Sequence, residues 1–201
     1  MDFLFSIAVL ILSVVVHEVS HGWAANYLGD PTARLSGRLT LNPLPHIDLI
    51  GSVLVPLLLF FMSTGLMFGW AKPVPVNPYN LRGKYAEAIV AGVGPLSNIF
   101  VALIIGLLMR LGAALLPAPF VHIGASVVII NIVLAIFNLV PIPPLDGSKI
   151  LFAFLPYHLQ NLRDSLERWG FFIVLFFIVF LWQYLTPVIG VVFSLITGIS
   201  L

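Results

Sequence analysis

Residues 3–26 read FLFSIAVLILSVVVHEVSHGWAAN. A helix of about 20 mostly apolar residues can cross the hydrocarbon core of a bilayer, so this stretch predicts a transmembrane helix. It also contains two histidines and a glutamate, His17, His21 and Glu18. Ionisable side chains are costly in lipid unless they are paired or face a polar cavity. Their presence in an apolar helix therefore indicates a functional site within the membrane.

The rest of the chain has the same apolar character. Of its 201 residues, 60% are hydrophobic and 8% are charged, and the mean hydropathy is +1.11. One soluble core cannot bury this much apolar surface. Further apolar runs lie at roughly 49–69, 86–112, 122–140 and 169–201. We therefore predict an all-α polytopic membrane protein with about four to six transmembrane or re-entrant segments, in which residues 1–201 form a single domain.

Charge and cysteine content restrict the partners. The formal net charge is +1, and the nine lysines and arginines are scattered along the chain. This pattern lacks the basic patch that nucleic-acid binding requires, so the lipid bilayer and membrane-embedded molecules are the expected partners. The chain has no cysteine, so any metal ion must be held by histidine, aspartate or glutamate.

Two connectors between the apolar runs have distinct patterns. In residues 34–41, hydrophobic and polar side chains roughly alternate before Asn42 and Pro43, which predicts a short membrane-associated strand that ends in a turn. Residues 70–79 contain three prolines and are expected to be extended. An edge strand at 34–41 would be able to pair with an extended peptide.

His17 and His21 are spaced to share one metal ion. Residues four apart in a helix lie on the same face, about one turn from each other. Zinc in hydrolases keeps three protein ligands and an open position, while a nearby carboxylate takes a proton from water. Glu18, next to the first histidine, fits this base role. The alternative is a chance match, which is common for short patterns in soluble helices but costly in a transmembrane one.

Asp146 is the best-placed third ligand. It follows a proline-rich stretch that begins after Asn138 and contains Pro141, Pro143 and Pro144. Prolines break a helix, and broken backbone at membrane depth is tolerated where it lines a cavity or is buried in protein. A carboxylate there is able to point inward.

Other ionisable residues have a weaker claim on the metal. Asp48 and Asp164 fall in connectors where a solvated carboxylate is expected. His46, beside Asp48, is either an alternate ligand, a hydrogen-bond donor to the transition state, or a structural residue.

The motifs together resemble a known family. The pair His17 and His21, followed late in the chain by Leu145-Asp146-Gly147, is similar to the pattern of the site-2 protease family of zinc intramembrane proteases. The segment AGVGPLSN at 91–98 and Asn138 before the proline-rich break also resemble that family.

The resemblance implies a function and a set of site residues. The implied activity is regulated intramembrane proteolysis, in which a single-pass or signal-peptide-like substrate is unwound and cut near the membrane. The implied ligands of one zinc ion are His17, His21 and Asp146, with Glu18 as general base. The chain would be a short form without a PDZ or nucleotide-sensing domain, in a prokaryotic cell membrane.

A protease of this kind must hold its substrate extended, because the amides of a helix are bonded internally. Asn138 and a strand near 35–41 are the candidates for this contact, together with His46. The alternative role for Asn138 is structural, in which its amide satisfies backbone groups freed by Pro141. Asn98 is expected to join helices by hydrogen bonds, with small neighbours that allow close packing.

Two rival functions use the same features. A transporter of metal ions or small solutes also has broken apolar helices with buried ionisable residues, but it needs no glutamate beside its ligand. A catalytically inactive scaffold would be expected to have lost some of these residues.

The positions of the two motifs also predict the topology. Both lie near the C-terminal ends of their apolar runs, 3–26 and 122–140, so the two helices must run parallel to meet at one depth. This requires that 49–69, with Pro56 in its middle, re-enters rather than spans. Every lysine and arginine except Arg110 then falls on one side. The positive-inside rule places that side, with the active site, in the cytoplasm.

Overall fold

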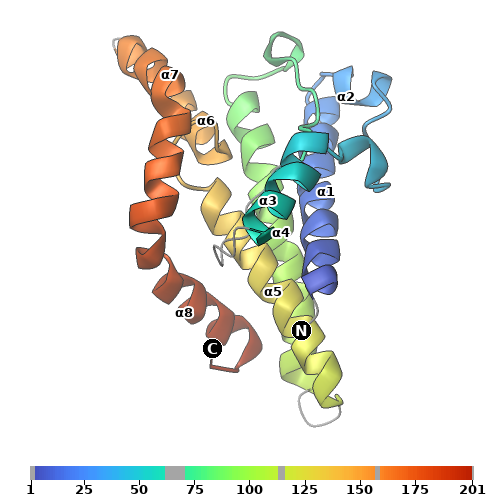
Figure 1. The fold of residues 1–201 in the computed structure, drawn as a ribbon. Coiled ribbons are helices and arrows are strands. Elements are labelled where there is room, and N and C mark those ends of the chain that lie inside the picture. Colours follow the sequence, from blue (N-terminus) through green and yellow to red (C-terminus); the bar gives the residue numbers. More distant parts are fainter. Residues whose placement is uncertain (1–2, 62–70, 113–115, 157–158, 201) are drawn as a thin grey trace.

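The computed structural model describes residues 3–61, 71–112, 116–156 and 159–200, and its regular elements are helices (Figure 1). Four of the helices in this described part are long and apolar enough to cross a membrane: Leu4–Tyr27, Ala86–Gly112, Ala118–Asn138 and Gln160–Tyr184. The all-α polytopic class expected from the sequence is confirmed.

The long helices are α1 (Phe3–Tyr27), α4 (Ala86–Gly112), α5 (Ala118–Asn138) and α7 (Gln160–Phe176). The shorter α-helices are α2 (Thr32–Leu35), α3 (Val55–Phe61), α6 (Asp146–Ala153) and α8 (Thr186–Thr197). Turns of 3-10 geometry occur at Leu44–His46, Pro78–Asn80 and Trp182–Tyr184. Turns of π geometry occur at Leu49–Leu54 and Phe177–Leu181.

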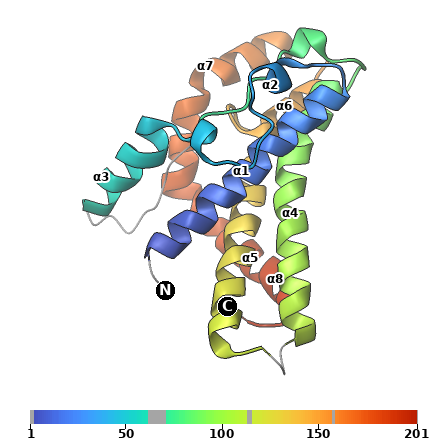
Figure 2. The same cartoon turned by 90° about the vertical axis from the view of Figure 1, so that its right-hand side faces the viewer.

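Helices α1, α4 and α5 lie side by side, and their directions are set by their contacts (Figures 1 and 2). His21 in α1 contacts Val90 near the start of α4, while the earlier His17 contacts the later Asn98. These two helices therefore run antiparallel. Asp146, which follows the end of α5, reaches the same two histidines. Helices α1 and α5 are consequently parallel, as predicted from the positions of the two motifs.

A core cluster lies away from the two histidines, where α8 packs against α4 and α5. Its buried members are Ala102, Met109, Val128, Ile132, Ile189 and Phe193. Gly106 permits this packing, because a Cβ atom at that position would overlap the side chain of Ile196. Helix α8 ends at Gly198, whose φ of 75° lies in the left-handed region that favours glycine.

Large apolar side chains also cover the outside of the bundle. Leu4, Phe100, Leu111 and Phe171 are each more than half exposed. Such a surface is stable only when lipid replaces water around it, because each exposed apolar side chain would otherwise cost hydrophobic free energy. The packing therefore agrees with a multi-pass membrane protein.

The connectors after α1 and before α4 meet at one end of the bundle. Arg38 Nη2 donates to the carbonyl oxygen of Lys72 at 2.7 Å, and the Lys72 amide donates to the carbonyl oxygen of His46 at 2.9 Å. His46 and Lys72, which flank the run 49–69, therefore lie at the same end of the bundle. The part of this run at 62–70 lies outside the described residues, so the re-entrant path itself stays a prediction.

Asp30 ties these connectors to the end of α1. Its carboxylate accepts hydrogen bonds from the backbone amide of Asn77 at 2.7 Å and from Asn80 Nδ2 at 2.9 Å, as well as from Thr32. Burial raises the pKa of Asp30, but the hydrogen bonds from Thr32, Asn80 and Asn77 outweigh it and hold the pKa below its ordinary value.

The predicted β element after the first helix is wrong. Residues 34–41 contain the end of α2, a turn and irregular chain, and no strand occurs in the described part of the protein. The alternation instead reflects packing of a loop on α1. Leu39 fills the space beside Gly22, while the buried Arg38 turns toward the neighbouring connector. That connector contains Pro73, which has no amide hydrogen for a strand ladder.

The last apolar run, predicted at 169–201, is divided differently. A continuous helical segment covers Gln160–Tyr184, and α8 is a separate apolar helix of 12 residues. The break follows the π turn Phe177–Leu181 and precedes Pro187, which occupies the first turn of α8. Proline has no amide hydrogen to donate and is therefore favoured at a helix start. Hydrophobicity alone carries no signal for this boundary.

Candidate metal centre

Three ligand atoms from distant parts of the chain converge between α1 and α6. Asp146 Oδ2 lies 3.1 Å from His17 Nε2 and 3.1 Å from His21 Nε2, and the two Nε2 atoms are 3.0 Å apart. All three residues are buried. This group could hold a metal ion.

Local structure explains how each side chain reaches this point. His17 and His21 are one turn apart on α1 and point the same way, as the helical period requires. Asp146 begins α6 directly after the proline-rich turn. Gly147 allows this entry, because a Cβ atom there would overlap the carbonyl oxygen of Leu139. The glycine after the aspartate is thus required by a close backbone approach.

The chemistry of the three groups fits a cation. His21 Nδ1 lies 2.7 Å from the carbonyl oxygen of Val90. A carbonyl oxygen only accepts, so neutral His21 carries its hydrogen on Nδ1 and presents a lone pair at Nε2. This lone pair faces the Asp146 oxygen and the second imidazole. Tetrahedral ligands at zinc–ligand distances of about 2.0–2.1 Å lie roughly 3.3 Å apart, which is close to the spacing found here.

Gly94 makes room for both imidazole rings. A Cβ atom at this position of α4 would overlap His21 Nε2 and lie 2.8 Å from His17 Cε1. The expectation that small residues in this segment allow close packing is confirmed at Gly94. The packing places α4 against the two histidines.

The second carboxylate oxygen of Asp146 faces a cation. Lys149 Nζ lies 3.8 Å from Asp146 Oδ1, and the lysine side chain is about half exposed. The site therefore has a buried side formed by the histidines and a partly exposed side near Lys149.

Glu18 lies on α1 between the two histidines and is held from outside the helix. Its Oε2 accepts a hydrogen bond of 2.8 Å from the backbone amide of Val74, in the connector before α4. Because the donor is a backbone amide, the contact orients the carboxylate without supplying a competing charge. The connector thereby contributes to the site although none of its side chains was predicted to do so.

Comparisons with known proteins agree with this geometry. Residues 113–181 match the model of peptidase family M50. YwhC of Bacillus subtilis, named as a zinc metalloprotease, is 36% identical over 186 residues, which cover 89% of this chain and 78% of YwhC. Rip2 of Mycolicibacterium smegmatis, also named as a zinc metalloprotease, is 31% identical over 173 residues, which cover 86% of this chain and 65% of Rip2. No solved structure matches the chain significantly.

The chain belongs to the site-2 protease family. This membership confirms the resemblance found in the motifs. The protein is therefore an intramembrane zinc metalloprotease. The family acts on membrane-protein substrates in the bilayer, and neither the comparisons nor the described residues support the transporter alternative.

The hydrogen bonds of the two candidate substrate contacts, Asn138 and His46, go to backbone carbonyl groups of their own segments. Asn138 is the last residue of α5, and its Nδ2 donates to the carbonyl oxygen of Leu134 at 3.0 Å. His46 is buried in the connector after α1, and its Nε2 donates to the carbonyl oxygen of Thr40 at 3.0 Å. A role in substrate binding stays a prediction for both.

One contact in the site was not predicted from the sequence. Asn98 was expected to join helices, and it does donate to Asn131 Oδ1 at 2.8 Å. It also contacts the candidate ligand His17, since Asn98 Oδ1 lies 2.6 Å from His17 Nδ1. The segment AGVGPLSN at 91–98 carried this signal, but nothing local indicates which partner an asparagine amide will meet.

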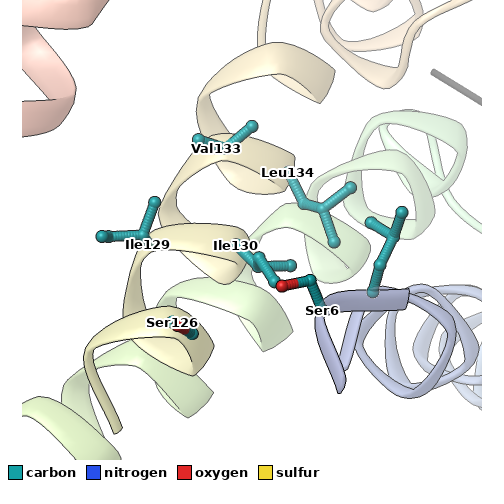
Figure 3. A pocket seen from close by; sticks show the side chains of 7 residues that line it. Ser6, Ser126, Ile129, Ile130, Val133 and Leu134 are labelled. Carbon is teal, nitrogen blue, oxygen red and sulfur yellow. The ribbon is translucent and has the colours of Figure 1, made fainter. Parts of the chain in front are cut away.

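An apolar cavity of about 340 Å³ lies along the seam between α1 and α5 of this protease (Figure 3). It is lined by Ser6, Leu10, Ser126, Ile129, Ile130, Val133 and Leu134. None of these residues is ionisable, and none belongs to the candidate metal centre. The lining of the cavity therefore offers no group for acid–base catalysis or metal binding.

Proposed function

We propose that His17, His21 and Asp146 bind the catalytic zinc ion and that Glu18 is the general base for hydrolysis of membrane-protein substrates. The convergence of Asp146 Oδ2 with the two Nε2 atoms at 3.0–3.1 Å carries this proposal. These atoms come from segments more than 120 residues apart in the chain. Three neutral or anionic ligands leave one position of a tetrahedral site open, as catalytic zinc requires.

In the proposed reaction, the metal ligands and Glu18 have different roles. Bound zinc supplies Lewis acidity that activates water and polarises the scissile carbonyl group. Glu18 removes a proton from the attacking water as its oxygen bonds to the carbonyl carbon. When the carbon–nitrogen bond breaks, Glu18 returns that proton to the leaving amine. The Val74 amide holds the carboxylate in place during both transfers.

The proposed substrates are single-pass membrane proteins or signal-peptide-like segments. Burial of the three ligands among α1, α4 and α6 supports cleavage at membrane depth, because a soluble peptide would have to enter a lipid-facing bundle. The substrate backbone must be extended near the zinc, and we assign contacts with it to Asn138 and His46. Residues 1–201 would act together as one protease domain.

Reconstituted protein should cleave a panel of fluorescently tagged single-pass substrates within or beside their transmembrane segments. Chelation should abolish cleavage, and added zinc should restore it, because the Lewis acid is essential. Mass spectrometry of the products locates the cut. Cleavage that continues after complete zinc removal, or cleavage confined to soluble loops, would contradict the proposal.

We further propose that the metal centre faces the cytoplasm of a prokaryotic cell. The connectors that hold Arg34, Arg38, Lys72, Arg82 and Lys84 lie at the same end of the bundle as the metal centre. Positively charged loops are retained on the cytoplasmic side, so this charge distribution supports that orientation.

Cysteines introduced at Ser36 and at Lys72 should both react only with reagent that has access to the cytoplasm. A cysteine at Leu116, at the opposite end of the bundle after α4, should react only from outside and serves as the control. The chain has no native cysteine, so every signal comes from the introduced residue. Labelling of Ser36 and Lys72 positions from opposite sides would exclude the re-entrant arrangement.

A further inference from the structure

A chain of buried, hydrogen-bonded polar side chains runs from the candidate metal centre to α5. Asn98 and Asn131 are fully buried, and Ser13 is nearly so. Asn98 Nδ2 donates to Asn131 Oδ1 at 2.8 Å and to the backbone carbonyl oxygen of Ser13 at 3.2 Å. Asn131 Nδ2 donates to Ser13 Oγ and to the carbonyl oxygen of Val127, both at 2.9 Å. The chain thus links α1, α4 and α5.

Backbone carbonyl groups determine which way both amides point. A carbonyl oxygen only accepts hydrogen bonds, so the Asn98 atom facing Ser13 must be the nitrogen. The Asn131 atom that faces the carbonyl oxygen of Val127 must likewise be its nitrogen. Each amide oxygen is therefore the remaining atom. The oxygen of Asn131 faces the nitrogen of Asn98, and the oxygen of Asn98 faces His17 Nδ1.

This orientation has a consequence for His17. Because Asn98 Oδ1 only accepts, His17 Nδ1 must carry a hydrogen and donate it across the 2.6 Å contact. Neutral His17 then presents its lone pair at Nε2, which is the atom 3.1 Å from Asp146 Oδ2. With the opposite tautomer, Nε2 would carry a hydrogen and would be unable to bind a metal ion.

We propose that Asn98, oriented by Asn131 and Ser13, is a positioning residue that holds His17 in its metal-binding tautomer. The inference rests on the proposed zinc site and adds the groups that prepare one ligand for it. Helix packing alone does not require this arrangement, since an apolar side chain of similar volume would fill the same space without burying polar atoms. Groups that hydrogen-bond to a ligating histidine orient its ring and raise its basicity.

Two variants at position 98 distinguish a role in positioning His17 from a role in joining the helices alone. Asn98→Asp keeps an oxygen that accepts from His17 Nδ1 but loses the nitrogen that bonds Asn131 and Ser13. Asn98→Leu loses both. A positioning role predicts zinc affinity within about 3-fold of wild type for the aspartate variant and a loss of about 10–100-fold for the leucine variant. If Asn98 had only a structural role, through the hydrogen bonds of its nitrogen, both variants would lose zinc affinity equally.

Zinc affinity of the purified full chain is measured by competition with a chromophoric chelator. Visible spectra of the cobalt-substituted protein give a second readout, because they report the number and geometry of metal ligands. The aspartate variant should reproduce the wild-type spectrum, and the leucine variant should not. Asn131→Leu should weaken zinc binding less, by about 3–10-fold, because Ser13 still holds Asn98.

Thr197→Val is the matched control for loss of a buried hydrogen bond. Thr197 Oγ1 donates to the carbonyl oxygen of Phe193 in α8, and the residue is nearly as buried as Asn98 but has no hydrogen bond to His17. Its zinc affinity should equal that of wild type. Thermal unfolding of each variant distinguishes loss of fold from loss of metal.

The measurements distinguish failure of the positioning role from failure of the proposed zinc site. Equal zinc affinity in wild type and Asn98→Leu, or equally weak affinity in Asn98→Leu and Asn98→Asp, would overturn the positioning role while leaving the zinc site intact. Wild-type protein that binds no zinc would instead overturn the proposed function. If Asn98→Leu does not fold, the proposal still requires tight zinc binding by Asn98→Asp.

Discussion

Glu18→Gln is expected to lower the rate of substrate cleavage by a factor of about 10² to 10⁴, the usual contribution of a general base. Glutamine has nearly the same shape and still offers an oxygen to the Val74 amide, so the fold should be unchanged. It cannot take a proton from water or return one to the leaving amine. Single-turnover cleavage of a tagged substrate in proteoliposomes measures the effect, and elemental analysis should show unchanged zinc.

Glu167→Gln is the matched control for this loss of a carboxylate. Glu167 is exposed and forms an ion pair of 2.8 Å with Arg163, four residues earlier in α7. Exposed ion pairs of this kind contribute only about 0–1 kcal/mol to folding stability, so cleavage should stay near the wild-type rate. Substantial cleavage by Glu18→Gln would assign the base role to another group.

Removal of a proposed ligand should have the largest effect on zinc binding. Wild-type protein is expected to hold about one zinc ion per chain, and the double variant His17→Ala, His21→Ala should hold none. Asp146→Ala should weaken zinc binding by more than about 100-fold, since even a partner outside the ligand set contributes about 10–100-fold. Elemental analysis and chelator competition on purified protein measure both effects.

Asp48→Ala and His46→Ala are the matched controls for a lost carboxylate and a lost imidazole. The Asp48 side chain accepts hydrogen bonds from the amides of Ile50 and Gly51 at the start of a helical turn. The His46 side chain bonds within its own connector. Both variants should keep their zinc. Loss of zinc from these variants, with zinc kept by Asp146→Ala, would show that Asp146 is not the third ligand.

Several features follow from the sequence because they depend on local spacing. Apolar runs of about 20 residues identify helices that lipid can surround, and the run at 86–112 coincides with the bounds of α4. The separation of four between His17 and His21 places both on one face of a helix whatever the rest of the fold does. Their side chains do meet at one point in the structure.

Other features depended on tertiary contacts and were not predictable. Alternation in residues 34–41 matched a strand, but a strand also needs a partner with free amide and carbonyl groups, and periodicity does not specify one. Arg38 and Leu39 instead pack against a neighbouring loop and α1. The break between α7 and α8 likewise lies inside continuous apolar sequence.

The sequence by itself determined the membrane class, the pair of histidines with Glu18 between them, and the resemblance to the site-2 proteases. Asp146 was predicted from the sequence as the third ligand. Only the tertiary structure decided how closely its carboxylate approaches the two histidines, that Asn98 contacts His17, and that the Val74 amide holds Glu18. The physical reason is the range of the interactions. A helix repeats every 3.6 residues, so sequence spacing alone determines which of its side chains are neighbours. A hydrogen bond between helices instead depends on how they pack and on the path of every connector between them.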